Sequence, residues 1–291
     1  MRDVEWIITE KCNFRCSYCH CDTGPHATDE VVEAVLHYIA SVFKADRVNL
    51  CGGEPIIAPS IKRVARYLQD HGIPLSTDSN VSLPLRRILE ILEAGGSNFY
   101  YVHTTLHPEF HDFDDFCTKV RAIRDTGRQV DVRLIAIHDQ WDRVQSDFAR
   151  LIDAGMRPKI KLEKYRRREG TLRVPRNILP PYSDEQLRWI GATLDLAVDD
   201  LLEDYAYHSF TGQPCSAGWN SVYIDVAGLV YRCTGAEKAN DPMGHASTLG
   251  PPELARRPCA YGVCPCREVQ RLGLLMPDAA QADEASPSAT P

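Results

Sequence analysis

The sequence predicts an α/β fold: an open, partial (β/α)6 TIM-like barrel with a small C-terminal β-hairpin and cysteine-rich module. Two observations lead to this prediction. Strand-like and helix-like segments alternate before residue 165, and a short hairpin pattern lies among late cysteines. Regular βα alternation predicts a parallel sheet with right-handed crossovers. Six strand segments are too few for a closed eight-stranded barrel. We therefore expect an open barrel, and a doubly wound sheet is the alternative.

Hydrophobic periodicity and breaker residues place each element. In the first expected helix, Val32, Val35 and Ile39 recur at helical spacing behind Thr28, a suitable N-cap. Another expected helix starts with Pro84, a residue favoured at helix starts. The expected strands cover residues 4–9, 47–50, 73–77, 99–105, 130–137 and 159–164, and the expected helices cover residues 29–43, 60–71, 84–94, 113–126 and 141–154.

The remaining chain divides into three parts after a core of residues 1–165. Residues 166–207 form a proline-containing connector and one helix, expected from Asp184 to about Tyr205. Residues 208–276 form the cysteine-rich module. Residues 277–291 are rich in Ala, Ser, Pro, Asp and Glu, a composition typical of disorder.

Composition narrows the function classes. The formal net charge of −7 disfavours a nucleic-acid partner and is compatible with a cationic small-molecule substrate. No apolar run is long enough for a membrane span, and the N-terminus lacks the pattern of a signal peptide. We therefore expect a cytoplasmic protein without a membrane partner. Eleven cysteines in such a protein indicate metal or redox chemistry rather than disulfides.

Three early cysteines carry the main functional signal. Cys12, Cys16 and Cys19 follow a C-x3-C-x2-C spacing, which supplies three thiolates from one short loop and no fourth. A structural zinc site normally takes four protein ligands. An iron–sulfur cluster held by three thiolates keeps one iron open. Half of a zinc ribbon or a chance cluster is the alternative interpretation.

A second motif follows a short strand 33 residues after Cys19. The strand runs directly into Gly52-Gly53-Glu54-Pro55. Paired glycines at a strand end allow a ligand to approach the backbone closely, because no Cβ intervenes. The carboxylate of Glu54 can accept a hydrogen bond from an ammonium group.

Together the two motifs resemble the signature of the radical S-adenosylmethionine (SAM) superfamily. The resemblance implies a [4Fe-4S] cluster on Cys12, Cys16 and Cys19, with SAM bound at the open iron. It also implies that Tyr18 packs against adenine and that the motif at Gly52, Gly53 and Glu54 holds the SAM amino group. The resemblance further implies a (β/α)6 barrel with its chemistry at the carboxyl ends of the strands. It also implies an external one-electron reductase such as flavodoxin or ferredoxin.

The late cysteines surround a hairpin pattern at residues 221–225 and 229–232, with a turn at Ala227-Gly228. This arrangement resembles the auxiliary-cluster module called twitch, a shortened SPASM module. The resemblance implies a second [4Fe-4S] cluster on Cys215, Cys233, Cys264 and Cys266, with Cys259 as a possible substitute. One of Cys259, Cys264 and Cys266 is then spare and is a candidate hydrogen donor. A zinc site is the alternative. Of the unassigned Cys21, Cys51 and Cys117, the last two fit small buried hydrophobes.

Other candidate site residues follow strand ends, where barrel chemistry lies. Asp78, Ser79 and Asn80 follow the third strand as candidate SAM contacts, although a plain turn is an equal alternative. Arg133 is a candidate partner of the SAM carboxylate, with an ordinary salt bridge as the alternative. The segment His107, Glu109, His111, Asp112 invites a metal interpretation, which Pro108 disfavours by breaking the helical spacing. The expected substrate contacts are His103, His107, Glu109, Lys161 and Glu163.

The resemblance implies hydrogen abstraction from an unactivated C–H bond by a 5′-deoxyadenosyl radical. The acidic balance and surplus thiols favour epimerisation of an amino sugar or aminoglycoside with a cysteine hydrogen donor, similar to the neomycin-type epimerases. Alcohol dehydrogenation of an aminocyclitol and radical modification of a ribosomal peptide are the alternatives within the superfamily. A zinc-binding scaffold without turnover is the alternative of another class.

Overall fold

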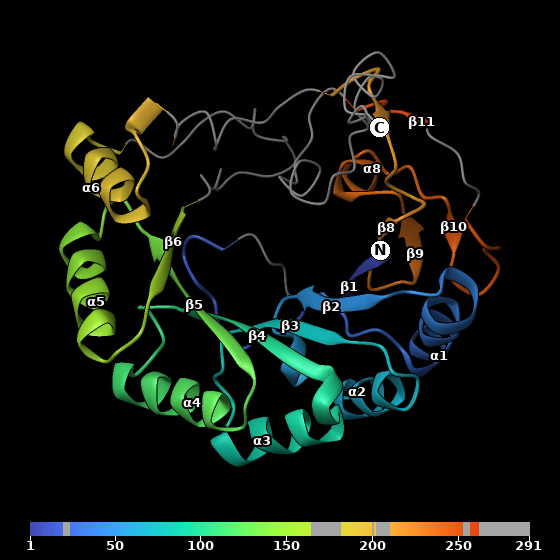
Figure 1. Ribbon diagram of the computed structural model, residues 1–291, viewed down its shortest axis with the longest axis horizontal. Coiled ribbons are helices and arrows are strands. Elements are labelled where there is room, and N and C mark those ends of the chain that lie inside the picture. The colour runs from blue at the N-terminus through green and yellow to red at the C-terminus, as the bar shows by residue number, and fades with distance from the viewer. Residues whose placement is uncertain (20–23, 164–181, 200, 202–209, 253–256, 262–291) are drawn as a thin grey trace, which may run out of the picture.

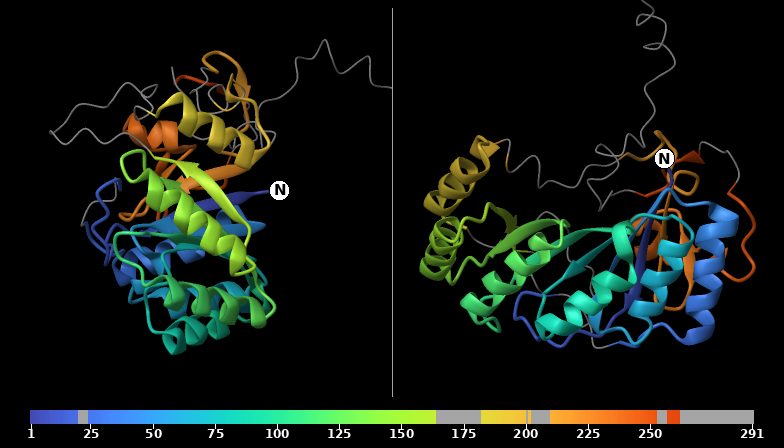
Figure 2. Two further views of the ribbon diagram at one scale, coloured as in Figure 1. Left: turned by 90° about the vertical axis from the view of Figure 1, so that its left-hand side faces the viewer. Right: turned by 60° about the horizontal axis from the view of Figure 1, so that its bottom comes forward.

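The computed structural model describes residues 1–19, 24–163, 182–199, 201, 210–252 and 257–261. These residues form one nine-stranded sheet in the order β10-β9-β8-β1-β2-β3-β4-β5-β6, and a separate two-stranded pair, β7 and β11. Figure 1 shows the sheet curving into an arc with α1 to α5 along its outer side. Figure 2 shows the same helices from two other directions.

The core strands and helices lie where the sequence places them. The strands are β1 (Asp3–Thr9), β2 (Arg47–Gly52), β3 (Leu75–Ser79), β4 (Phe99–Leu106), β5 (Gln129–Ala136) and β6 (Pro158–Leu162). The helices are α1 (Asp29–His37, followed by a π-helix at Tyr38–Phe43), α2 (Ile61–Asp70), α3 (Leu85–Ala94), α4 (Phe113–Asp125) and α5 (Trp141–Asp153). Each expected core strand agrees with an observed one to within two residues.

The strand order decides between the two expected topologies. Strands β1 to β6 pair in parallel and each neighbours the next one along the chain. A doubly wound sheet requires the order to reverse at a switch point. The sequential order and the curvature in Figure 1 therefore confirm the partial barrel.

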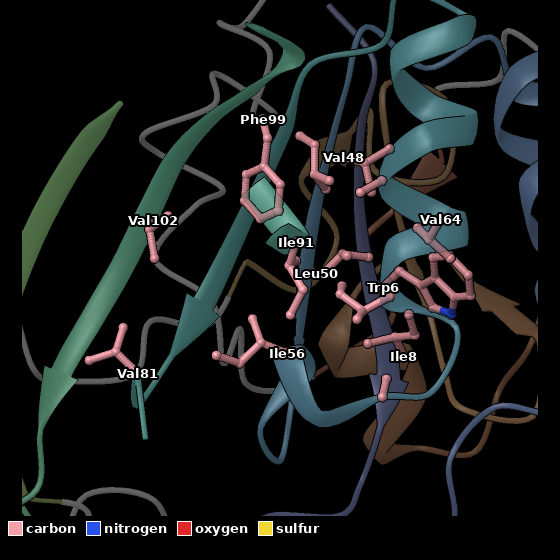
Figure 3. Close-up of a cluster of buried hydrophobic side chains, with 14 of the residues drawn as sticks. Trp6, Ile8, Val48, Leu50, Ile56, Val64, Val81, Ile91, Phe99 and Val102 are labelled. Atoms are coloured by element: carbon pink, nitrogen blue, oxygen red, sulfur yellow. The ribbon is translucent and has the colours of Figure 1, made fainter. Parts of the chain in front are cut away.

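The hydrophobic core lies between the sheet and the outer helices. In α2 one face is buried, carrying Val64 and Leu68 at helical spacing. Trp6, Leu50 and Phe99 reach the same layer from three strands, as Figure 3 shows. Burying a large apolar side chain contributes roughly 1.5–3 kcal/mol. Because alternate strand residues point to opposite faces, the residues between the core positions, such as Asp131 and Arg133 on β5, point to the other face of the sheet.

The late hairpin extends the barrel sheet. It consists of β8 (Ser221–Ile224) and β9 (Leu229–Tyr231), and β10 (Gly244–His245) pairs with β9. β8 pairs in parallel with β1, with Val222 opposite Val4 and Ile224 opposite Trp6. The hairpin itself was expected, but within a separate module. Val222 and Ile224 are almost fully buried, because their side chains belong to the same hydrophobic core as those of the barrel strands.

The connector differs from the sequence prediction. α6 (Asp184–Leu194) begins at the Ser183 capping box, but the single helix expected up to about Tyr205 is wrong. Asp195 adopts a left-handed conformation with φ of 57°, and the Leu196 N–H donates to the Gly191 carbonyl. Asp is one of the few residues that visit this conformation readily, and it is not a strong helix breaker. The apolar periodicity therefore gave no indication that the helix ends before Asp195. Residues 202–209 lie outside the described part.

Within the described part, no helix has both the length and the apolar character needed to cross a bilayer.

Candidate active site

The cysteine loop, residues 10–19, joins β1 to the segment before α1 at the carboxyl edge of the sheet. Cys16 is buried, and Cys12 and Cys19 are half-buried. The Cys19 N–H donates to the Cys16 carbonyl at 3.1 Å, and the Phe14 N–H points at Cys12 Sγ at 3.4 Å. The three thiols are thus held within one compact loop.

The paired glycines let the chain's own backbone pass close by. The Gly53 N–H donates to the Thr9 carbonyl at 2.8 Å. A Cβ on Gly52 would lie 2.0 Å from the Thr9 carbonyl oxygen, and one on Gly53 would lie 2.1 Å from the Lys11 carbonyl oxygen. These glycines were expected to admit a ligand. In the structure, their lack of a Cβ also admits the backbone of Thr9 and Lys11.

Glu54 lies beneath the loop and is only 1% exposed. Its carboxylate accepts hydrogen bonds from Ser79 Oγ at 2.8 Å, the Asn80 N–H at 2.5 Å and the Ile56 N–H at 3.4 Å. Burial raises the pKa of this carboxyl to about 7, against the lowering effect of those bonds. Glu54 and Ser79, both expected to contact SAM, therefore bind each other and tie the end of β2 to the end of β3.

The end of β3 also supports the first half of the loop. Asn80 Nδ2 donates to Asn13 Oδ1 at 3.1 Å and lies 3.8 Å from Cys12 Sγ. Asn13 Nδ2 in turn donates to Ser82 Oγ at 2.6 Å. Asn80, a predicted SAM contact, therefore touches the predicted cluster-binding loop.

The segment after β4 supports the second half of the loop. His107 Nδ1 lies 2.9 Å from Tyr18 Oη and 3.3 Å from Cys16 Sγ. Tyr18 is buried and its ring lies parallel to the His107 ring. Glu109 accepts hydrogen bonds from the N–H and the hydroxyl of Ser17. His107 and Glu109, expected as substrate contacts, thus contact the loop between the cysteines.

The histidines of this segment are engaged in hydrogen bonds. The His107 N–H donates to His111 Nδ1 at 2.8 Å, which leaves His111 Nε2–H to donate to the Asn80 carbonyl at 2.6 Å. Burial lowers the pKa of His107 to about 3 and that of His111 to about 4. In the described ranges, no group of three or more His, Cys, Asp or Glu side chains is arranged to bind a metal ion.

The thiols of the loop fit an iron–sulfur cluster in their chemistry. Burial raises the pKa of Cys12, and it raises the pKa of Cys16 to about 12. Cys12, Cys16 and Cys19 lie close enough for each thiolate to disfavour the others. The thiols would therefore stay protonated alone, and bound iron would supply the positive charge that makes them thiolates.

Polar side chains occupy the concave face of the barrel. Asp131 and Arg133 lie two residues apart on β5, and Arg133 pairs with both Asp78 and Asp131. His103 Nδ1 lies 3.1 Å from Asp131 and Lys159 Nζ lies 3.3 Å from it. Burial raises the pKa of Asp131, but these neighbours outweigh it and lower the pKa to about 2. Arg133 and Asp78, two predicted SAM contacts, therefore form an ion pair with each other.

A second polar group lies where β5 and β6 end. Glu163 accepts from the His138 N–H at 3.1 Å and lies 2.7 Å from His138 Nδ1. Tyr182 Oη accepts from the Glu163 N–H at 2.9 Å and donates to the Ala136 carbonyl. Lys161 is exposed on β6, between the buried Ile160 and Leu162, as the expected alternation requires. These side chains are distant from the cysteine loop in the sequence, and none of these bonds joins them to it.

The described late cysteines lie at the end of the hairpin. β7 (Pro214–Cys215) pairs with β11 (Arg257–Pro258), and the Cys259 N–H donates to the Gln213 carbonyl at 2.9 Å. Arg232, the neighbour of Cys233, donates to the Cys215 carbonyl at 3.2 Å. Three predicted ligands or donors, Cys215, Cys233 and Cys259, therefore lie on paired or linked segments. Cys264 and Cys266 lie outside the described residues, as does Cys21.

Buried polar atoms near this region lack partners within the described part. They are Trp219 Nε1, Asn220 Oδ1 and Thr234 Oγ1. Thr234 directly follows Cys233 in the chain. Cys51 and Cys117, by contrast, are buried in β2 and α4, as expected for small hydrophobes.

Several residues that shape the site were not predicted from the sequence. No role was predicted for Asn13, Phe14 and Ser17, which lie between the cysteines. Each of them contacts a segment that follows a strand. Asp131 carried a usable signal, because residues two apart on a strand share a face and Arg133 was already a candidate. No sequence pattern could have identified Ser17, because its partner Glu109 is 92 residues away.

Comparisons with known proteins give a family and a shared fold. A model of the radical SAM superfamily matches residues 6–166, more than half of the 291 residues. Over 243 residues the chain is 23% identical to the antilisterial bacteriocin subtilosin biosynthesis protein AlbA of Bacillus subtilis (strain 168), covering 78% of this chain and 53% of AlbA. The chain thus spans about half the length of that relative.

Two solved structures share the fold at low sequence identity. Native anSMEcpe with bound AdoMet has a TM-score of 0.61 at 12% identity, covering 86% of this chain and 79% of that chain. Streptococcus suis SuiB has a TM-score of 0.58 at 13% identity, covering 85% of this chain and 63% of that chain.

Proposed function

Because the chain belongs to the radical SAM superfamily, we propose that it abstracts a hydrogen atom from a C–H bond of its substrate. The family implies SAM and a [4Fe-4S] cluster, which together supply an electron and a 5′-deoxyadenosyl radical when bound. One observation carries the proposal. Cys12, Cys16 and Cys19 share one loop, and two glycines let the start of that loop pack directly on the carboxyl end of β2.

The chain's own residues would bind and orient the reactants. Cys12, Cys16 and Cys19 would hold the cluster, and the buried Tyr18 would remain fixed by His107. The charged concave face offers Asp78, His103 and Lys159 for polar groups of a substrate. Its charges are already paired, so this face adds no support for a cationic substrate in particular.

A second cluster is part of the proposal. Cys215 and Cys233, with two of Cys259, Cys264 and Cys266, would hold it. The pairing of β7 with β11 and the bond from the Arg232 side chain to the Cys215 carbonyl support this placement. The orphaned hydroxyl of Thr234 also supports it, because hydrogen bonds to cluster sulfur are common. An external one-electron reductase such as flavodoxin or ferredoxin completes the proposal.

We infer that the substrate is a peptide rather than the amino sugar that the composition favours. AlbA is named for the biosynthesis of a bacteriocin, and its similarity extends over 78% of this chain. Solved structures of anSMEcpe and SuiB contain bound peptides, named Cp18Cys and SuiA. The proposed reaction is epimerisation, in which a late cysteine returns a hydrogen atom from its thiol. One electron from the external reductase and one proton would then restore that thiol from the thiyl radical. Five late cysteines exceed the four ligands of a cluster, which leaves one thiol for this step.

Anaerobic reconstitution tests the core of the proposal. We expect a brown protein with about eight iron atoms per chain that releases 5′-deoxyadenosine from SAM on reduction. The triple variant Cys12→Ala/Cys16→Ala/Cys19→Ala should lose 5′-deoxyadenosine release. Cys117→Ala, which removes a buried thiol of α4, should keep it. A colourless protein with stoichiometric zinc would indicate the zinc-binding scaffold instead.

The product identifies the substrate class and the reaction. Candidate peptides and aminoglycosides would be incubated with the enzyme in deuterated water. Deuterium at a single inverted carbon, absent in a Cys259→Ala, Cys264→Ala or Cys266→Ala variant, would support epimerisation. Loss of two hydrogen atoms would indicate dehydrogenation, and turnover of an aminoglycoside alone would overturn the peptide assignment.

A further inference from the structure

Glu109 binds the cysteine loop between two predicted cluster ligands. Its Oε2 accepts from the Ser17 N–H at 2.8 Å, and its Oε1 accepts from the Ser17 hydroxyl. Ser17 stands directly after Cys16 and two residues before Cys19. One carboxylate therefore engages both donors of the residue that spaces these two thiols. Charge-assisted bonds of this kind are stronger than bonds between neutral groups.

The segment that carries Glu109 is itself fixed. Residues 107–111 form a turn in which the Phe110 and His111 N–H groups donate to the His107 carbonyl. His111 Nε2 donates to the Asn80 carbonyl at 2.6 Å, and Arg143 of α5 donates to the Pro108 carbonyl at 2.5 Å. Because its backbone is already fixed, Glu109 loses only side-chain conformational entropy when it binds Ser17.

Aromatic contacts reinforce the same pairing of segments. Phe110 stacks on Phe14 of the loop, with ring centroids 4.9 Å apart. His111 meets Phe14 edge-on at 5.0 Å. Phe110 remains 43% exposed, so this contact contributes less than a buried aromatic pair would. The polar bonds of Glu109 are therefore the more specific part of the junction.

We propose that Glu109 is a positioning residue for the cluster on Cys12, Cys16 and Cys19. It fixes Ser17, and through Ser17 the separation and direction of the Cys16 and Cys19 thiolates. Its negative charge also disfavours an added electron on the cluster, and so lowers the reduction potential. This inference rests on the proposed function, because it requires that the loop hold a cluster.

Glu109→Gln separates the charge from the shape of the side chain. We expect chelator-induced bleaching of the anaerobic protein to be roughly tenfold faster than in wild type, since a charge-assisted bond is lost. We expect a more positive reduction potential in an EPR-monitored titration, with a smaller difference from wild type at high ionic strength. A purely structural role would leave the potential unchanged.

Two further variants make the test specific. Ser17→Ala keeps the amide bond and the carboxylate charge, so bleaching should accelerate only a few-fold and the potential should stay near wild type. In the double variant, the two effects on bleaching should be less than additive, because both act through one contact. Asp112→Asn is the matched control for bleaching, since Asp112 accepts from the Asp115 N–H at the start of α4 and should leave the bleaching rate unchanged.

The outcomes distinguish this inference from the proposed function. Wild-type protein that takes up no iron–sulfur cluster would overturn both. Wild type with a stable cluster, and Glu109→Gln with the same bleaching rate and potential, would overturn the role of Glu109 alone. Additive effects of the two substitutions would show that Glu109 does not act through Ser17.

Discussion

The cysteine loop at residues 10–19 and the late cysteine region around β7, β9 and β11 are held in place by different means. The end of β2 contacts the loop through its backbone, and the segments after β3 and β4 contact it through the side chains of Ser82 and Glu109. The late region is held mainly by backbone pairing, because β8 joins β1 and β7 joins β11. The described part of this region therefore depends on the barrel sheet.

This difference separates two ways of building a cysteine site. A short spacing along the sequence supplies the three thiols of the loop. The strand ends of the barrel then hold the loop in its conformation. The late thiols come from segments far apart in the chain, so their meeting depends on strand pairing. Substitutions in the loop should therefore impair the cluster with little effect on the fold, and substitutions in the hairpin should affect both.

The largest expected effect comes from Gly53→Ala. The new Cβ would lie 2.1 Å from the Lys11 carbonyl oxygen and 2.4 Å from its carbon, so the loop backbone must move. We expect the rate of 5′-deoxyadenosine release to fall at least about 100-fold, because misplacement of about 1 Å has effects of that size. Gly250→Ala is the control, since nothing lies within 4 Å of its Cβ position. Equal activity of the two variants would contradict the close packing.

The next effect comes from Ile224→Ala in β8. Ile224 is fully buried opposite Trp6, and its truncation leaves a cavity between the hairpin and the barrel. We expect the free energy of unfolding to fall by about 2–5 kcal/mol, measured by urea denaturation of the whole chain. An unchanged unfolding transition for the barrel would show that the hairpin folds as a separate unit.

The smallest effect concerns the pH dependence of the metal-free loop. The native pKa of Glu54, raised to about 7, exceeds its ordinary value of 4.5, so the native state binds the proton more tightly. Its contribution to stability is therefore fully present below about pH 4.5 and is lost as the pH rises through about 7. A shift from 4.5 to about 7 corresponds to a change of roughly 3 kcal/mol.

Glu54→Gln cannot ionise and isolates this contribution. Urea unfolding of metal-free wild type and variant would be compared at several pH values between 4.5 and 8. The stability of wild type should fall relative to the variant as the pH rises. A difference between the two proteins that does not vary with pH would contradict the raised pKa.

Much of the fold could be predicted from the sequence because its signals are local. Apolar periodicity, the Thr28 cap and the proline at the start of α3 act within a few residues of the element that they specify. The break at Asp195 escaped prediction because the apolar pattern continues past it and Asp is not a strong helix breaker. Local propensity alone does not decide such a position.

The site was predictable only where its residues share a motif. Cys12, Cys16 and Cys19 were found by spacing, and Glu54 by its place after two glycines. The partners within the chain were not named, since Glu109 was a candidate substrate contact and Arg133 was a candidate for either the SAM carboxylate or an ordinary salt bridge. The structure gives Glu109 the Ser17 hydrogen bonds and gives Arg133 the carboxylates of Asp78 and Asp131.

The sequence by itself determined the alternation of strands and helices, the thiol-bearing loop and the family to which the chain belongs. Only the tertiary structure decided that the late hairpin continues the barrel sheet and that the β4 end holds the cysteine loop. The physical reason is distance along the chain. Pairing of Trp6 with Ile224, or of Ser17 with Glu109, depends on contacts between segments that no local pattern connects.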